Sequence, residues 1–427
     1  MSHQAKATKN DIAWEQVFDD LRILDWIKRE ELYVIDSKTI NEYRESRLMA
    51  KIDHRANRPR LFVKHQLSIL PISRSQYVIG HFDTHKKVHY KGRENPRPIS
   101  IPSYLESIDS SNLYSEQSAL LFAFNSGIIA DLLGGNPHFT LTGRMTSGDF
   151  SFNIGDVRQP AKFHNIDVTN SQIEIDAGFE TEACLALIEA KNQLIEDFNT
   201  RQLYYPYRLW ASRVRKPLKS ILMTFSNDIF SFFVYEFIDP TNYGSAALVG
   251  QYHYSLLSDV ITKDELRGLF SQIQCEPEPD LPFPQANSFE RLIDLLGLLF
   301  EGRLSKDDIT LNYEFDERQS DYYTRAGMYL GLIARDYEGN YVLSDEGRAI
   351  MLLNSKKKRL RLIERILSRR AFNEAFALFL QAGEMPSREE IASIINKVRL
   401  DISGATPWRR ASTISGWIRW IVQQVEW

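Results

Sequence analysis

Two short stretches decide the fold: Ile173-Glu174-Ile175-Asp176-Ala177-Gly178, and then Leu185-Ala186-Leu187-Ile188-Glu189-Ala190-Lys191-Asn192. Each is an apolar run that ends in charged residues, and turn-forming residues separate the two runs, which is typical of neighbouring β-strands. Residues two apart in a strand share a face, so Glu189 and Lys191 point the same way. If the strands form a hairpin, Asp176 can lie beside that pair.

The segments on either side of these strands alternate between helical and extended patterns. Residues 113–133 predict one long helix with Ser115 as its N-cap, and Gly134-Gly135 ends it. A polar helix is expected at Gln193–Trp210. The order of helix, strands, helix and strands predicts an α/β (α+β) core, a mixed sheet flanked by helices. The other expected strands are Phe139–Leu141, Phe150–Ile154, Ser220–Thr224 and Ile229–Phe237.

The 427-residue chain is long enough for two to four domains. The N-terminal hundred residues combine helical spacing, a helix expected from Ser37, and extended segments at Leu61–Leu70 and Gln76–Phe82. Residues 276–285, EPEPDLPFPQ, contain four prolines and predict a stiff connector. We therefore expect an N-terminal helical and hairpin DNA-recognition domain at 1–100, a catalytic core at 101–240, a connector at 241–285 and a mainly helical, winged-helix-like DNA-binding region at 286–427.

Composition narrows the class of protein. The formal net charge is −4, so any surface for nucleic acid has to be local, and the stretch from Ser355 to Trp427 is the basic part of the chain. The two cysteines, Cys184 and Cys275, form no CxxC pair, and no apolar signal core or 18-residue apolar run occurs. We expect a cytoplasmic protein without a membrane partner. No phosphate-binding loop motif occurs, so ATP is not an expected ligand.

The two carboxylates and the lysine suit phosphodiester hydrolysis. Carboxylate oxygens hold Mg²⁺, and the bound ion polarises the phosphate and stabilises the leaving oxygen. A lysine beside the ion can orient or deprotonate the attacking water. Asp176 and Glu189 are therefore the expected metal ligands, and Lys191 is the expected partner of the water. Glu174 and Glu180 are alternative carboxylates.

The arrangement Asp176, Glu189-Ala190-Lys191 and a following helix resembles the catalytic core of PD-(D/E)XK nucleases. This resemblance implies a restriction-endonuclease-like mixed sheet, with Glu116 as an additional acidic residue on the first core helix and Gln202 as a supporting contact. The chain departs from the family pattern at Ile175, where proline is usual. Thr142-Gly143-Arg144 and Pro282-Phe283-Pro284-Gln285-Ala286 are similar to segments of type II restriction endonucleases that carry winged-helix parts.

Two C-terminal helices have the composition of DNA-reading helices. The first, Asp316–Ile333, precedes a hairpin at Tyr337–Val342, which is a winged-helix layout; the second is Thr406–Val422. Arg and Gln suit base edges, whereas Ser, Thr and Tyr suit phosphates. An amphipathic helix with a solvated face is the alternative for each. The candidate DNA contacts are Arg318, Gln319, Ser320, Tyr323, Arg325, Arg409, Arg410, Ser412 and Thr413.

Two further charged segments are open to more than one interpretation. The run Lys356–Arg361 either follows phosphates or forms a solvated helix face. His81, His85 and His89 recur at a spacing of four, which would suit a zinc-binding helix, but the surrounding residues favour a hairpin. Lys86 and Lys87 in that hairpin are the expected DNA contacts.

The sequence thus predicts a type II restriction endonuclease that hydrolyses double-stranded DNA with Mg²⁺. Cutting both strands of a short site requires two active sites, and one chain shows only one, so a homodimer is expected. Two alternatives remain open at this point: a non-catalytic winged-helix regulator, and a less specific nuclease of repair or defence.

Overall fold

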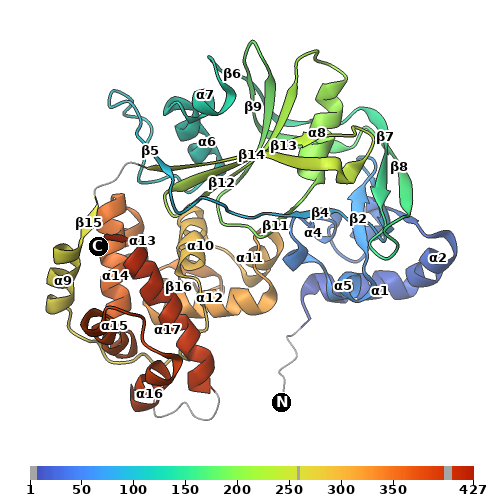
Figure 1. Cartoon of the computed structure of the whole chain (residues 1–427). Coiled ribbons are helices and arrows are strands. Elements are labelled where there is room, and N and C mark those ends of the chain that lie inside the picture. The colour runs from blue at the N-terminus through green and yellow to red at the C-terminus, as the bar shows by residue number, and fades with distance from the viewer. Residues whose placement is uncertain (1–6, 257–259, 399–405) are drawn as a thin grey trace.

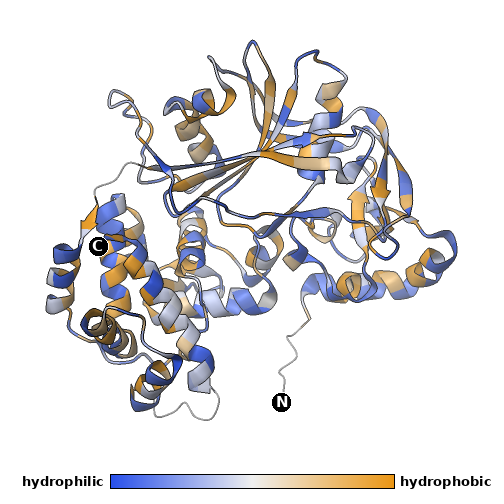
Figure 2. Ribbon diagram, in the orientation of Figure 1, coloured by the Kyte–Doolittle hydropathy of each residue, from blue (hydrophilic) through white to orange (hydrophobic). Residues whose placement is uncertain are grey.

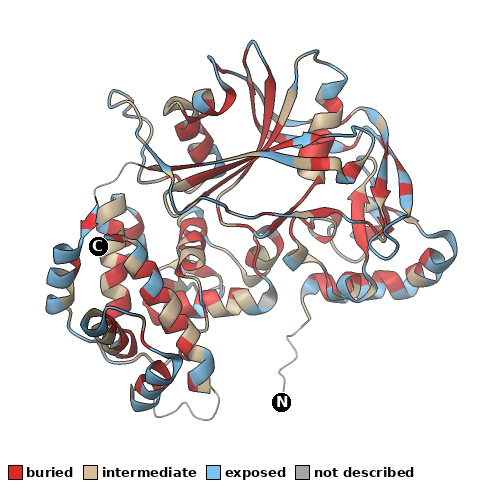
Figure 3. Ribbon diagram, viewed as in Figure 1, coloured by how far each residue is buried: buried red, intermediate tan, exposed pale blue. Residues whose placement is uncertain are grey.

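A computed structural model describes residues 7–256, 260–398 and 406–427. A mixed sheet occupies one end of the molecule, the N-terminal helices lie below one side of it, and the C-terminal helices lie below the other (Figure 1). The helices α10 (Phe289–Glu301), α11 (Lys306–Asn312) and α12 (Glu317–Tyr329) lie between these two lower parts. In Figure 3 the central strands are almost wholly buried, whereas the outer helices bury one face each.

The central sheet has seven strands in the order β5-β14-β13-β12-β10-β9-β6. β10 pairs with β12 in parallel, as β14 does with β5, and the other neighbours are antiparallel. The expected mixed α/β architecture is confirmed. The sheet extends past both ends of the range 101–240, because β5 and β14 belong to it. The strands are β5 (Arg97–Ile99), β6 (His138–Thr146), β9 (Gln172–Glu180), β10 (Leu185–Lys191), β12 (Leu218–Ser226), β13 (Ile229–Phe237) and β14 (Ala246–Leu256).

Helices cover both faces of the sheet. α6 (Glu116–Asn125) and α7 (Ile128–Leu133) pack on one face against apolar strand residues such as Ile188 and Ile221. α8 (Arg201–Ala211) and the hairpin of β7 (Asp149–Gly155) and β8 (Phe163–Thr169) cover the other face, where Leu222 and Phe233 are buried. The alternation of side chains along each strand explains why a single strand contributes to both apolar layers, and Figure 2 shows the apolar colour concentrated in these strands.

Two of the expected core helices have different bounds. The segment 113–133 is two helices, because Gly127 adopts a left-handed conformation with φ of 85° and starts a new helix. The helix expected at Gln193–Trp210 begins only at Arg201. The residues before it form a loop and β11 (Asp197–Asn199), which pairs with β4 (His85–Lys87). Backbone pairing with a distant strand thus overrides the local helical pattern.

The N-terminal region has its own small core. α1 (Lys9–Asp20), α2 (Ile23–Glu30) and α5 (Arg60–His65) pack beside the sheet β1-β3-β2, with Trp14, Phe18 and Phe62 in mutual contact. The extended segment expected at Leu61–Leu70 is wrong in its first half, because burial of Phe62 favours the helix α5. The helix expected from Ser37 is present as α3. The remaining elements are β1 (Tyr33–Asp36), α3 (Ser37–Asn41), α4 (Ser46–Met49), η1 (Arg55–Asn57), β2 (Ser68–Pro71) and β3 (Gln76–Gly80).

The C-terminal region is helical and contains three helices followed by a short hairpin. α10 (Phe289–Glu301), α11 (Lys306–Asn312) and α12 (Glu317–Tyr329) precede a hairpin of β16 (Ile333–Arg335) and β17 (Tyr341–Leu343). Gly339 has φ of 84° at the turn, and Leu304 forms a bridge to Tyr341. The other elements are β15 (Ile261–Thr262), α9 (Lys263–Gln272), α13 (Asp345–Met351), α14 (Ser355–Leu367), α15 (Arg370–Ala382), α16 (Arg388–Val398), α17 (Thr406–Gln423) and β18 (Val425–Glu426).

The proline-rich segment 276–285 packs along this region. Glu276 pairs with Arg365 and Arg369 of the C-terminal helices, and Phe283 is buried against Phe372. The segment is thus bound along its length to the helices that follow it. Across the parts of the chain that the structure describes, no helix has both the length and the apolar character needed to cross a membrane.

Candidate active site

A bulge in β9 places Asp176 beside the end of β10. Leu141 of β6 pairs with Gly178 of β9, and Gly143 pairs with Ile175. The step between these two pairs is therefore two residues long in β6 and three residues long in β9. The additional residue of a bulge re-aims a side chain, and the Asp176 carboxylate consequently reaches across to β10. There its Oδ2 accepts a hydrogen bond of 2.7 Å from the backbone N–H of Ala190.

Glu189 is held by two neighbouring side chains. Its Oε1 accepts a 2.5 Å hydrogen bond from Lys191 Nζ and another of 2.5 Å from Gln202 Nε2. Glu189 and Lys191 lie on the same face of β10, as their spacing predicts, and that face is the one covered by α8, which supplies Gln202. The side chains of Lys191 and Glu189 are only 13% and 10% exposed, so this pair is largely buried.

Glu116 reaches the same place from the opposite side of the sheet edge. It is the first residue of α6, where Ser115 is the N-cap as predicted. The residue is exposed, yet the loss of surrounding water raises the pKa of its carboxyl. The charge of Asp176 raises this pKa further, whereas the charge of Lys191 lowers it. The five residues expected to form the catalytic site, which come from four different elements, are therefore neighbours.

Burial and mutual repulsion dominate the electrostatics of the carboxylates. Burial raises the pKa of Glu189 to about 8; the charges of Asp176 and Glu116 add to the increase, and Lys191 opposes it. Burial also raises the pKa of Asp176, and Lys191 again opposes the shift. Burial alone would lower the pKa of Lys191, but the surrounding carboxylates outweigh it and raise that pKa. The site thus has an excess of negative charge around one ammonium group.

These residues suit a hard divalent cation. Glu116 and Asp176 lie close enough to Glu189 for their charges to raise its pKa, and oxygen ligands of this type are those that Mg²⁺ binds. Gln202 Oε1 is buried and has no hydrogen-bond partner among the described residues. An orphaned buried acceptor beside carboxylates is the feature expected where a water or an ion completes the polar network. The donor set therefore fits Mg²⁺, with Asp176 and Glu189 as ligands and Glu116 within reach.

The sequence interpretation missed three charged residues at this site. Asp53 and Lys51 come from the N-terminal region, and Arg201 precedes Gln202 on α8; an Asp53 oxygen lies 3.7 Å from Lys51 Nζ and the other 3.9 Å from Arg201 NH2. Lys191 lowers the pKa of the buried Asp53 carboxyl against the opposite effect of burial. No local pattern in the chain points to Asp53, because it lies in an irregular segment more than a hundred residues from the strands it approaches.

The two alternative carboxylates lie elsewhere. Glu174 is exposed and pairs with Arg144 at 3.3 Å on the edge of the sheet. Glu180, at the other end of β9, pairs with Lys216 at 2.7 Å. Asp176 is the carboxylate of β9 that reaches Glu189 and Lys191.

The candidate DNA contacts on α12 divide into surface and core positions. Arg318 and Arg325 are exposed, and Gln319 is half-buried and accepts the N–H of Asp316 at 3.1 Å. Ser320 and Tyr323 are buried, at 0% and 7% exposure. These two side chains face the apolar core, so their assignment as DNA contacts is corrected; Tyr323 packs against Phe315.

The same division applies to α17. Arg409 is exposed, whereas Arg410 is half-buried and donates to Gln285. Ser412 donates a 3.0 Å hydrogen bond to Asn287 Oδ1, and so does Thr413 at 3.1 Å. Thr413 is wholly buried, and its assignment as a DNA contact is corrected as well. A polar residue on a helix was assumed to face solvent, but Asn287, an exposed residue that precedes α10, accepts the hydrogen bond of Thr413.

The arginines of α12 and α17 lie together. Burial lowers the pKa of Arg410, and the charges of Arg409 and Arg325 lower it further while Tyr322 opposes them. Two helices some eighty residues apart in the chain thus present one group, Arg325, Arg409 and Arg410, which we call the arginine cluster. A local concentration of guanidinium groups suits phosphate oxygens.

The histidines and lysines of the 81–89 segment have separate environments. His85 is buried between Thr84 and the carbonyl of Ile52, and burial lowers its pKa to about 3. His81 contacts the carbonyl of Gln66 and Arg158. His85 lies in β4, so the segment is not a zinc-binding helix, as the surrounding residues indicated; the expected hairpin is wrong, because β4 pairs with the distant strand β11. Lys87 is exposed and Lys86 is half-buried on the same strand.

A different buried group, His54, Asp197 and Glu314, joins the three parts of the chain. His54 Nδ1 donates to the carbonyl of Asp197 at 2.6 Å, and Glu314 accepts the N–H of Glu196 at 2.6 Å. Asp197 Oδ1 accepts the N–H of Arg55 at 2.8 Å. The potential ligand atoms lie within 4.8 Å of one another, but the hydrogen bonds already satisfy them. This group is a polar junction of the N-terminal region, the core and the loop before α12.

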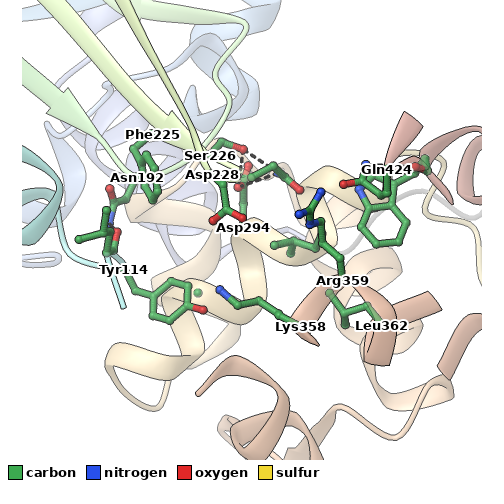
Figure 4. A pocket seen from close by; sticks show the side chains of 15 residues that line it. Tyr114, Asn192, Phe225, Ser226, Asp228, Asp294, Lys358, Arg359, Leu362 and Gln424 are labelled. Carbon is green, nitrogen blue, oxygen red and sulfur yellow. Dashed lines mark hydrogen bonds between the residues drawn. The ribbon is translucent and has the colours of Figure 1, made fainter. Parts of the chain in front are cut away.

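The run Lys356–Arg361 belongs to another internal contact. Lys358 is buried over the ring of Tyr114 at 5.1 Å, and Arg361 pairs with Glu346 and Glu364. Figure 4 shows Lys358 and Arg359 in a pocket between the core and the C-terminal helices, opposite Asp294 and Asp228. Burial raises the pKa of Asp294 to about 7. Lys358 and Arg361 therefore serve contacts within the protein, which leaves few of these charges for phosphates.

Comparison with known proteins matches three residue ranges of the chain to protein families and assigns no activity to any of them. Three protein-family models match the chain, each described as a domain of unknown function: DUF6996 at residues 11–79, DUF6997 at residues 80–255 and DUF7226 at residues 291–426. No curated protein and no solved structure matches. The five predicted catalytic residues lie in the second range and Asp53 lies in the first, so the site draws on two of the three matched regions.

Proposed function

We propose that this protein is a magnesium-dependent endonuclease that hydrolyses double-stranded DNA, in the manner of a type II restriction endonuclease. One observation carries the proposal: Glu116, Asp176, Glu189, Lys191 and Gln202 come from four elements and lie together around Glu189. The strand pair, the flanking helices and the acidic first helix follow the pattern of the PD-(D/E)XK nucleases that the sequence resembles.

The side chains divide the work of hydrolysis between them. Asp176 and Glu189 would hold Mg²⁺, with Glu116 assisting, and the ion would stabilise negative charge on the phosphate and on the leaving oxygen. Lys191, an ammonium fixed beside Glu189, orients the attacking water and offsets negative charge in the transition state. Gln202 keeps the Glu189 carboxylate in place, and its free Oε1 accepts a hydrogen bond from water. Rigid strands hold these groups, which favours attack from a defined direction.

The C-terminal winged helix and the arginine cluster supply the DNA-binding surface in this proposal. Arg325, Arg409 and Arg410 give a concentrated positive charge on a chain whose net charge is −4. Arginine binds phosphate oxygens in pairs and also reads guanine in the major groove. The cluster therefore supports binding to DNA rather than to a small phosphate ester.

Incubation of the full chain with phage or plasmid DNA tests the proposal. Discrete fragments are expected with Mg²⁺ and none with EDTA; a smear would indicate a nuclease without strict sequence preference. Lys191→Ala should abolish cleavage while DNA binding stays within about threefold. Lys216→Ala is the matched control, because that lysine pairs with Glu180 at the far end of β9. Equal activity of the wild type and the Lys191 variant would contradict the proposal and favour a non-catalytic DNA-binding protein.

Two chains are proposed to act on one duplex, because each chain offers one active site and both strands are cut. Sedimentation of the Lys191→Ala protein with a duplex that contains the cleavage site should show two chains per duplex. One chain per duplex would refute the dimer and leave sequential nicking by a monomer.

A further inference from the structure

Asp53 is a buried carboxylate with long ion pairs. Only 8% of the residue is exposed, and among the described residues its ion-pair partners are Lys51 at 3.7 Å and Arg201 at 3.9 Å. Buried charges in proteins are paired, and neither of these pairs is close. Arg201 precedes Gln202, which belongs to the proposed nuclease site.

The backbone fixes Asp53 at this place. Its carbonyl accepts a 2.8 Å hydrogen bond from the N–H of Asn199, and the carbonyl of Ile52 accepts a 3.0 Å hydrogen bond from the Asn199 side chain. Asn199 ends β11, two residues before Arg201. The segment that contains Asp53 is thus attached to the start of the helix that carries Gln202, and Gln202 donates to Glu189. A chain of direct contacts therefore connects Asp53 to the proposed metal ligand.

Asp53 and Lys191 also act on each other through their charges. Burial raises the pKa of Asp53, but Lys191 is the strongest influence in the opposite direction, ahead of Lys51 and Arg201, and the net shift is downward. In turn, Asp53 is one of the carboxylates that raise the pKa of Lys191. The carboxylate of Asp53 is therefore charged and lies within electrostatic reach of the Lys191 ammonium.

The hydrogen bonds of Glu189 explain why Lys191 would require a second carboxylate. Glu189 Oε1 accepts hydrogen bonds from Lys191 and from Gln202. A divalent cation on Glu189 repels an ammonium that stays on the same carboxylate. The ammonium then requires another anion close by. Glu116 and Asp176 face the cation in the proposed function, which leaves Asp53 among the carboxylates that raise the pKa of Lys191.

We propose that Asp53 is a positioning residue of the active site, which takes the Lys191 ammonium when Glu189 binds the divalent cation. This inference rests on the proposed function and deepens it. It also means that the region matching the first family model, residues 11–79, completes a site whose other acidic residues lie in residues 80–255. Asp53 would hold Lys191 at the distance from the cation at which the lysine can orient water.

Calcium binding to the metal-free full chain, measured by calorimetry, tests this role without any cleavage. Asp53→Asn keeps the shape of the side chain but removes the charge, so Lys191 has to stay on Glu189. Groups that orient a metal ligand from outside change metal affinity or activity by roughly 10- to 100-fold when they are removed. We expect Ca²⁺ affinity to fall by at least about tenfold, with Asp53→Glu recovering part of the loss.

Single-turnover cleavage with saturating Mg²⁺ and DNA binding in EDTA separate positioning from folding. Asp53→Asn should lower the cleavage rate at least about tenfold and leave DNA affinity and thermal unfolding close to wild type. Asp20→Asn is the matched control: its carboxylate lies in the same N-terminal region, accepts a hydrogen bond from Tyr43 at 2.8 Å, and is exposed. Its Ca²⁺ affinity and cleavage rate should stay within twofold of wild type.

The outcomes distinguish this inference from the proposed function. If the wild type cleaves DNA and Asp53→Asn binds Ca²⁺ and cleaves equally well, the positioning role is refuted and the nuclease proposal stands. An Asp53→Asn protein that loses thermal stability and DNA binding in proportion to its activity would show a structural role only, which also overturns the inference. If no DNA is cleaved but Ca²⁺ affinity depends on Asp53, the positioning role holds in a protein that is not a nuclease.

Discussion

The central sheet and the C-terminal helices make different use of polar residues that look alike in the sequence. Beside the middle of β9 and the last residues of β10, all the predicted catalytic side chains meet. On α12 and α17, only part of the predicted set lies at the surface, because Ser320, Tyr323 and Thr413 are buried. A polar residue in a buried strand has few directions available, whereas one on a helix can turn toward solvent or toward a neighbouring helix. Positions in a buried strand therefore allow a firmer prediction than helix faces.

The largest expected effect comes from substitutions of the candidate catalytic residues on β9 and β10. Asp176→Asn and Lys191→Ala should each lower the rate of cleavage on the order of 10²- to 10³-fold or more, because the first removes a proposed metal ligand and the second removes a positive charge beside the reacting phosphate. Glu116→Ala should lower it less, since Glu116 only assists. Single-turnover cleavage measures this order. A neutral Asp176→Asn would contradict the assignment of the metal ligands.

A smaller effect is expected from the arginine cluster, and it should change binding rather than chemistry. Arg325→Ala or Arg409→Ala should weaken DNA binding by about 1–3 kcal/mol if the side chain reads a base. If it contacts phosphate, the dependence of affinity on salt should fall by about one unit. Titration of labelled duplexes at several salt concentrations separates the two. Unchanged binding in both variants would place the DNA surface elsewhere in the chain.

The buried junction of His54, Asp197 and Glu314 should make the stability of the folded protein depend on pH. Burial raises the pKa of Glu314 to about 8, against the effects of the Glu196 N–H and of Arg291. The folded protein thus retains a proton on Glu314 between its ordinary pKa of about 4.3 and 8, where the unfolded chain has lost it. Stability from this group is present at low pH and declines as pH rises toward 8.

Thermal unfolding of the metal-free protein between pH 5 and pH 9 measures this decline. Glu314→Gln carries no charge at any of these values, so its melting temperature should fall less over the same range. Identical slopes for the variant and the wild type would show that Glu314 does not titrate in this window.

The smallest effect should come from the buried polar residues of the C-terminal helices. Thr413→Val removes a hydrogen bond to Asn287 and keeps the volume, so it should destabilise the protein by about 1 kcal/mol. DNA affinity should stay at the wild-type value, in contrast to Arg409→Ala on the same helix. Urea denaturation and duplex titration test the pair. Weaker DNA binding by a fully folded Thr413→Val protein would return this residue to the DNA surface.

The sequence by itself determined the class of fold and the centre of the site. Period-two alternation and turn residues located β9 and β10, and the spacing of Glu189 and Lys191 placed both on one face, because these features depend on neighbours in the chain. The N-cap at Ser115 and the hairpin turn at Gly339 are local in the same sense. The order of helices and strands was enough to predict a mixed sheet flanked by helices.

Only the tertiary structure decided which distant residues meet. The bulge at Asp176, the start of α8 at Arg201 and the approach of Asp53 depend on pairing between segments far apart in the sequence, and no local pattern records such contacts. The burial of Thr413 beside Asn287 and the approach of Arg325 to Arg409 and Arg410 depend on how the C-terminal helices pack around α10. The physical reason is common to all of them: burial and charge proximity arise from three-dimensional neighbours, whereas spacing along the chain sets only the direction of a side chain within its own strand or helix.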